Sequence, residues 1–135
     1  MGPARKGFNA ILGHRYIEWT DGRAVLELDI GGQHLNSVDF VHGGALMTLV
    51  DIAAGSAGTY AANPADHRGC LTISLTVNFL SPAKSGPLRI VGLRRGGGRS
   101  TFTATAEIFD ADNNLCVVGQ GVFRLLPHKG GKVAE

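Results

Sequence analysis

The chain has 135 residues, of which 44% are apolar and 18% charged, and its net charge is +2. This length suits one domain with its own core, and the composition argues against disorder along the whole chain. The positive charge is too small and too evenly spread to indicate nucleic-acid binding. Cys70 and Cys116 fit no metal or redox spacing, so we expect two reduced thiols in a cytoplasmic protein.

The ends of the chain are small and polar. No apolar segment of a signal peptide follows the first residues, and Asp51 interrupts the apolar stretch 43–62, so we expect no membrane association. We expect a flexible N-terminus over 1–7, one domain over 8–126 and a flexible C-terminal tail over 127–135.

The periodicity of apolar residues predicts six strands and one helix. The predicted strands span 16–19, 23–30, 70–80, 88–94, 100–109 and 115–126. The predicted helix runs from about 43 to 61, where Asn63-Pro64 ends it. In the strand 70–80, strict alternation places Leu71, Ile73, Leu75, Val77 and Phe79 on one face and Thr72, Ser74, Thr76 and Asn78 on the other.

The order of two strands, one long helix and four strands predicts an α+β fold, with one curved antiparallel sheet wrapped around a central helix. A helix that is apolar almost all round must be buried on most of its sides. One six-stranded sheet covers only one side. We therefore expect the other side, or an exposed strand edge, to meet a second copy of the chain.

Asp51 lies in the middle of the most apolar stretch of the chain, Gly43 to Gly55. A buried charge there costs several kcal/mol unless it is paired, neutralised or used, and no basic residue occurs between Asp51 and Arg68. One interpretation is a structural acid that bonds to backbone groups or to a distant arginine. The other is a functional acid.

The helix start supports the functional interpretation. The N–H groups of Gly43 and Gly44 have no intrahelical acceptor, and the helix dipole favours negative charge there, as an oxyanion hole requires. Asp51 lies seven residues beyond Gly44, roughly 10 Å along the helix axis, so one small carbonyl group cannot touch both. Two antiparallel copies of the helix solve this, and we expect a two-fold dimer with two composite sites.

Three further polar residues are candidates for the same site. Asn36 precedes the helix, where its amide could orient a carbonyl or a water, or serve an ordinary turn. Thr72 could position a water or be an exposed strand residue. His42 suits a hydrogen-bonding role at the helix entry better than a role as a base.

The segment Gly96 to Ser100 is glycine-rich and carries Arg99, but it lacks the sequence and context of a P-loop. A hairpin turn is the default interpretation, and its arginines could also meet the phosphates of a nucleotide-like tail. The sequence contains no Gly-x-Ser-x-Gly, His-Glu-x-x-His or Gly-x-Gly-x-x-Gly motif, and its five histidines show no metal-ligand spacing.

The segments His42-Gly43-Gly44, with an acid at Asp51, and Val77 to Ala83 resemble the hotdog-fold acyl-CoA thioesterases. The resemblance covers about residues 8–126 and is to the branch that includes the phenylacetate-pathway thioesterase. It implies the hotdog fold, dimers joined edge to edge that form homotetramers, and hydrolysis of a thioester to a free acid and coenzyme A.

The resemblance also implies roles for individual residues. Asp51 matches the general base or nucleophile, and Gly43 or Gly44 matches the backbone N–H that polarises the thioester carbonyl. Asn36 matches a residue that positions substrate or water, and Thr72 matches a hydroxyl residue. Regions that line the coenzyme A tail are matched by Asn78, Phe79, Ser81, Gly98, Arg99 and Ser100. No metal, cofactor or prosthetic group is implied.

Two alternatives remain. A hotdog dehydratase or hydratase would carry His-Phe-Pro-Gly or a hydratase motif, and neither is present. A non-catalytic acyl-CoA-binding or sensing protein would need no acid on the helix. The acyl group is left open between aryl and medium-length chains, since Leu46, Leu49, Ile52 and Phe79 serve equally well in a pocket or in the core.

Overall fold

The computed structural model describes residues 2, 3, 5–83 and 85–127. Its strands are β1 (Arg15–Thr20), β2 (Arg23–Leu28), β3 (Cys70–Phe79), β4 (Leu88–Gly97), β5 (Thr101–Phe109) and β6 (Leu115–Leu125). Its α-helices are α1 (Phe8–Leu12) and α2 (Gly43–Ala57), and its 3-10 helices are η1 (Gly32–His34) and η2 (Pro64–Asp66). The predicted segments 1–7 and 127–135 fall partly outside the described residues and stay predictions.

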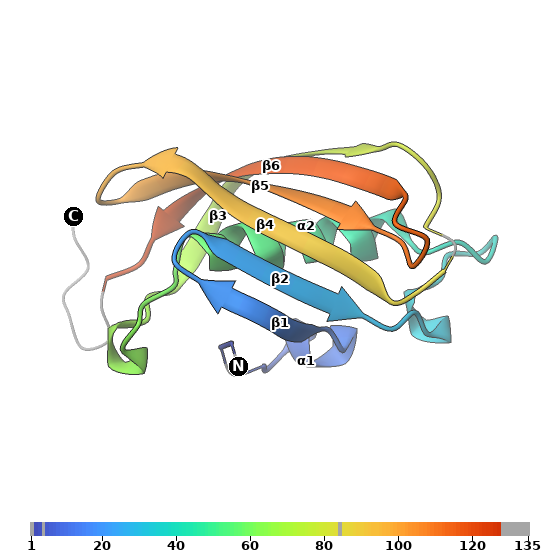
Figure 1. Ribbon diagram of the computed structural model, residues 1–135, viewed down its shortest axis with the longest axis horizontal. Helices are drawn as coiled ribbons and strands as arrows, with labels where there is room; N and C mark the ends of the chain where they lie inside the picture. The colour runs from blue at the N-terminus through green and yellow to red at the C-terminus, as the bar shows by residue number, and fades with distance from the viewer. Residues whose placement is uncertain (1, 4, 84, 128–135) are drawn as a thin grey trace.

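The six strands form one sheet in the order β1-β2-β4-β5-β6-β3, and every neighbouring pair is antiparallel. The sheet curves around α2, which packs against all six strands (Figure 1). The prediction of an α+β fold with one sheet wrapped around a central helix is therefore confirmed. Strands β1 and β3 are the two edges, so each has a strand neighbour on one side within the described chain.

The core lies between α2 and the concave face of the sheet. Leu49, Val50 and Ala53 of α2 are fully buried there. Gly92 of β4 allows the close approach of helix and sheet, because a Cβ atom at this position would lie 2.2 Å from the carbonyl oxygen of Ala53. Apolar burial and close packing of this kind are the main stabilising contributions to such a fold.

Helix α2 begins at Gly43 as predicted but ends at Ala57, earlier than the predicted end near 61. Gly58 is the C-cap of the helix. A Cβ atom at this position would lie 2.1 Å from the ring of Phe102, so the close packing of the backbone on this ring requires glycine. The Asn63-Pro64 signal marks η2 instead, where the side chain of Asn63 accepts a hydrogen bond from the N–H of Ala65. Helix α1 was not predicted, because five residues carry too little periodicity.

The strict alternation predicted for β3 is wrong at its beginning. Thr72 pairs with Phe123 and Ser74 with Val122, so Ile73 is an extra, bulged residue. A bulge shifts the face of every residue on one side of it. Leu71 and Ile73 are consequently 57% and 58% exposed, whereas Thr72 points toward α2.

Candidate active site

Asp51 lies in the third turn of α2, on the side that faces β3, and its side chain is partly exposed. The hydroxyl of Thr72 donates to Oδ1 of Asp51 at 2.5 Å. The ion pairs of the described residues join Arg15 or Arg23 to other acids, so no arginine neutralises Asp51 within the described chain. The carboxylate is thus oriented by one hydroxyl and is accessible to a ligand.

The start of α2 presents a backbone donor. The N–H of Gly44 donates to Nδ1 of His42 at 2.8 Å, and the N–H groups of Ala45 and Leu46 donate to the carbonyl of His42. Among the described residues, no acceptor faces the N–H of Gly43. A donor at a helix N-terminus favours negative charge. Gly43 therefore offers the free backbone N–H, and His42 accepts at Nδ1, which places its ring proton on Nε2 in the neutral form.

Gly43 and Asp51 lie on one unbroken helix, eight residues or roughly 12 Å apart along its axis. A single thioester carbonyl cannot contact both groups in one protomer. A composite site would need Asp51 of one protomer to lie beside Gly43 of a second protomer. The dimer with two composite sites therefore stays a prediction.

Asn36 supports the loop that leads into α2. Its Oδ1 accepts from the N–H groups of Val38 and Phe40, at 3.0 and 3.1 Å, and its own N–H donates to the carbonyl of Phe40. The amide oxygen is therefore engaged in turn chemistry. Its Nδ2 makes no hydrogen bond within the described chain and is the group that a substrate carbonyl or water could use.

A pocket of about 290 Å³ adjoins the carboxylate, and sequence reasoning missed the rings that line it. Asp51 and Thr72 line it together with the rings of Tyr16, Trp19 and His67. The rings of Trp19 and His67 are 4.6 Å apart between centroids. These residues come from β1 and from the segment before β3, so only the folded chain brings them beside Asp51.

Hydrogen bonds fix the aromatic wall of this pocket. The hydroxyl of Tyr16 lies 2.7 Å from Oγ of Ser56, and Nε1–H of Trp19 donates to the carbonyl of Ser56 at 2.8 Å. Aromatic side chains with a satisfied polar atom are rigid apolar surfaces. The pocket beside Asp51 is thus pre-formed on its β1 side.

Cys70 also lines this pocket, and its environment argues against a nucleophilic role. Burial, and to a lesser extent the nearby charge of Asp51, raises the pKa of the Cys70 thiol to about 11. A thiol that stays protonated near neutral pH is a poor nucleophile. Of the two side chains, Asp51 is the reactive candidate.

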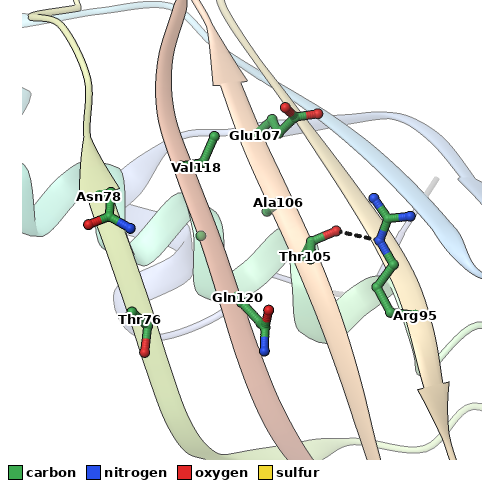
Figure 2. Close-up of a pocket in the computed structure, with 9 residues that line it drawn as sticks. Thr76, Asn78, Arg95, Thr105, Ala106, Glu107, Val118 and Gln120 are labelled. Carbon is green, nitrogen blue, oxygen red and sulfur yellow. Dashed lines mark hydrogen bonds between the residues drawn. The ribbon is translucent and has the colours of Figure 1, made fainter.

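The predicted contacts of β3 separate onto two faces. The ring of Phe79 lies at the start of α2, 3.5 Å from where a Cβ atom of Gly43 would be. Asn78 instead lies on the outer face, in a polar groove of about 480 Å³ that also holds Gln120 and Thr105, with α2 behind the strands (Figure 2). Ser81, just beyond β3, is exposed. The structure therefore does not bring Asn78 together with Asp51 in one protomer.

Gly98, Arg99 and Ser100 form the tight turn between β4 and β5, in which the N–H of Gly98 donates to the carbonyl of Thr101. Arg99 and Ser100 border a hollow of about 350 Å³ at the end of the sheet. Its other lining residues are Arg68, Leu71, Arg124, Leu125, Leu126 and Pro127. The lining thus combines three arginines with apolar residues, although Nε–H of Arg68 donates to the carbonyl of Leu126. This composition suits an anionic ligand with an apolar part.

The described residues contain no group of three or more His, Cys, Asp or Glu side chains placed to hold a metal ion. No helix among them is long and apolar enough to cross a membrane.

Comparisons with known proteins agree with the fold. The family model described as the thioesterase superfamily matches residues 39–117. A Saccharolobus solfataricus protein whose name describes it as a candidate esterase is 30% identical over 115 residues, 85% of this chain and 80% of its own length. The ComA2 protein of Bacillus subtilis, named likewise, is 28% identical over 111 residues, 81% of this chain and 86% of its own.

Solved structures give the same result. A conserved Pseudomonas aeruginosa protein superposes with a TM-score of 0.82 at 27% identity, over 92% of this chain and all of its own. The Escherichia coli PaaI protein, from the phenylacetic acid degradation operon, gives 0.73 at 26% identity, over 85% of each chain. The fold is thus that of the hotdog proteins. The chain belongs to the thioesterase superfamily, as the resemblance in its sequence predicted.

Proposed function

We propose that this protein is an acyl-CoA thioesterase that hydrolyses an aryl- or medium-chain acyl-CoA to the free acid and coenzyme A. The observation that carries the proposal is Asp51, an accessible carboxylate on α2 that is oriented by Thr72 and forms no ion pair within the described part of the chain. Membership in the thioesterase superfamily supports hydrolase activity. A protein that only bound or sensed acyl-CoA would have no need for such a carboxylate.

The proposed site is shared between two protomers. The thioester carbonyl of the substrate accepts a hydrogen bond from Gly43 of one protomer, and Asp51 of the other protomer approaches the carbonyl carbon. His42 holds the helix start, and Asn36 offers Nδ2 to the substrate or water. We propose that the dimers associate further into a homotetramer and that the enzyme works in the cytoplasm.

Two routes fit this arrangement. In the first, Asp51 takes a proton from water as the water oxygen bonds to the carbonyl carbon. In the second, an oxygen of Asp51 attacks that carbon and gives a mixed anhydride, which water then hydrolyses. In both, negative charge collects on the carbonyl oxygen beside the N–H of Gly43, and the carbon–sulfur bond breaks to release coenzyme A.

In this proposal, two hollows bind different parts of the substrate. The acyl group enters the pocket beside Asp51, where Tyr16, Trp19 and Ile52 offer apolar surface. The phosphates of coenzyme A lie against the hollow bordered by Arg99 and Ser100, which also contains Arg68 and Arg124. Phe79, at the helix start, lies against the pantetheine part. Asn78 faces the outer groove and contacts coenzyme A only at the edge of the sheet.

The test is thiol release, followed with a thiol-reactive dye, on a panel of aryl- and alkanoyl-CoA esters. We expect Asp51→Asn to lower turnover by roughly 10²-fold or more while the protein stays folded. The matched control is Asp21→Asn, at an exposed acid in the β1–β2 turn, which should retain turnover. If the wild type binds the esters and releases no thiol, the protein is an acyl-CoA-binding or sensing protein instead.

A further inference from the structure

His34, at the end of η1, is a buried side chain that the proposed reaction does not use. The N–H of Gly31 donates to its Nδ1 at 2.9 Å, and its Nε2 lies 2.7 Å from the carbonyl oxygen of Leu12. Because Nδ1 accepts, the ring proton is on Nε2, which donates to Leu12. One neutral tautomer therefore satisfies both partners and ties the end of α1 to the segment before α2.

The backbone of His34 extends this connection to the helix start. Its carbonyl accepts from the N–H of His42 at 2.7 Å, and Leu35 forms an antiparallel bridge with Val41. His42 in turn accepts the N–H of Gly44 through Nδ1. A continuous path of hydrogen bonds thus runs from Leu12 through His34 and His42 to the first turn of α2.

The space beside this path is hollow. A cavity of about 330 Å³ lies between α1 and the helix start, and its lining includes Phe8, Ile11, His34, His42 and Gly44. Leu12 is the buried residue of α1 and belongs to the same hydrophobic core as Leu46 of α2. The hydrogen bonds of His34 add a directional, polar connection between α1 and the segment before α2.

We propose that His34 is a positioning residue, which orders His42 and the free N–H of Gly43 for the thioester carbonyl. This inference rests on the proposed thioesterase function. Loss of the imidazole leaves the part-buried N–H of Gly31 and the buried carbonyl of Leu12 without these partners, and the segment that carries His42 shifts. Displacement of a catalytic donor by about 1 Å can lower a rate about a hundredfold.

Three substitutions separate the two hydrogen bonds of the ring. His34→Leu removes both, His34→Asn keeps an acceptor near the place of Nδ1, and His34→Gln keeps a donor near the place of Nε2. We expect His34→Leu to lower kcat roughly tenfold or more with KM changed less than about threefold. We expect His34→Gln to recover part of kcat, because it restores the bond to Leu12.

The matched control is His14→Leu, at another buried histidine near the end of α1, whose Nδ1 has no partner. We expect this variant to keep kcat. A second readout needs no substrate: amide hydrogen exchange over residues 42–46 should be faster in His34→Leu and unchanged in His14→Leu. Both are measured well below the melting temperature of each variant.

The proposal is overturned if kcat of His34→Leu stays near the wild-type value, or if His14→Leu lowers kcat equally. Unchanged exchange over 42–46 in His34→Leu also overturns it. If the wild-type protein releases no thiol from any ester, the proposed function fails. In that case, amide hydrogen exchange over residues 42–46 is the only remaining test of whether His34 orders the helix start.

Discussion

Thr72 reaches Asp51 because Ile73, the next residue in β3, is bulged. In a regular strand with Leu75 and Val77 facing the core, Thr72 would point to the opposite face. The bulge therefore places a hydroxyl against the carboxylate on α2. Bulges often re-aim a side chain at a functional site in this way.

Replacement of this hydroxyl by a methyl group should affect turnover more than stability. We expect Thr72→Val to lower kcat roughly ten- to a hundredfold, because Asp51 loses the donor that orients it, and we expect Thr72→Ser to keep most activity. Thr76→Val is the matched control, since Thr76 lies in the outer groove of the same strand. Equal turnover in Thr72→Val and Thr76→Val would remove Thr72 from the site.

The thiol of Cys70 should react slowly with alkylating reagents near neutral pH. Burial, aided by the charge of Asp51, raises its pKa to about 11, so only about one thiol in a thousand is ionised at pH 8. We expect the labelling rate to rise with pH, and to be higher in Asp51→Asn than in the wild type at the same pH. A Cys70→Ser variant identifies the labelled thiol, because Cys116 is buried in the core. A labelling rate unaffected by Asp51→Asn would contradict the coupling.

The stability of the protein should fall in mild acid because of His14. Burial, and then the charge of Arg5, lowers the pKa of His14 below its ordinary value of about 6.5. Above about pH 6.5 the His14 ring is neutral in both the folded and the unfolded chain. Below this pH the unfolded chain binds a proton more readily than the folded chain does. The free energy of unfolding therefore decreases as the pH falls. Denaturant unfolding between about pH 7 and pH 5 measures the slope. His14→Leu should make the slope shallower, and an unchanged slope would refute the assignment.

The packing of α2 on β4 depends on Gly92. A Cβ atom there would overlap the carbonyl of Ala53, a backbone group that cannot rotate away. We expect Gly92→Ala to lower the free energy of unfolding by about 1–3 kcal/mol or more, as measured in urea. Gly96→Ala, on the same strand and with no atom within 4 Å of its Cβ position, is the control. Similar losses in both variants would indicate a backbone effect rather than a clash.

The sequence predicted the sheet, the central helix and the position of Asp51, because periodicity reports which residues face a core. It could not locate the bulge, because Ile73 fits the regular alternation of apolar residues between Leu71 and Leu75. It also missed Tyr16, Trp19 and His67 beside Asp51, because these contacts join segments distant in the chain. Asn36 was recognised, but only the folded loop shows which of its atoms is engaged.

Trp19 is the single tryptophan of the chain, and it borders the pocket beside Asp51 while its ring contacts His67. Its fluorescence therefore comes from one defined place in the molecule. Ligand entry changes the polarity around the indole. The protein thus carries an intrinsic optical reporter, which allows occupancy of the pocket to be followed without a label or a chromogenic substrate.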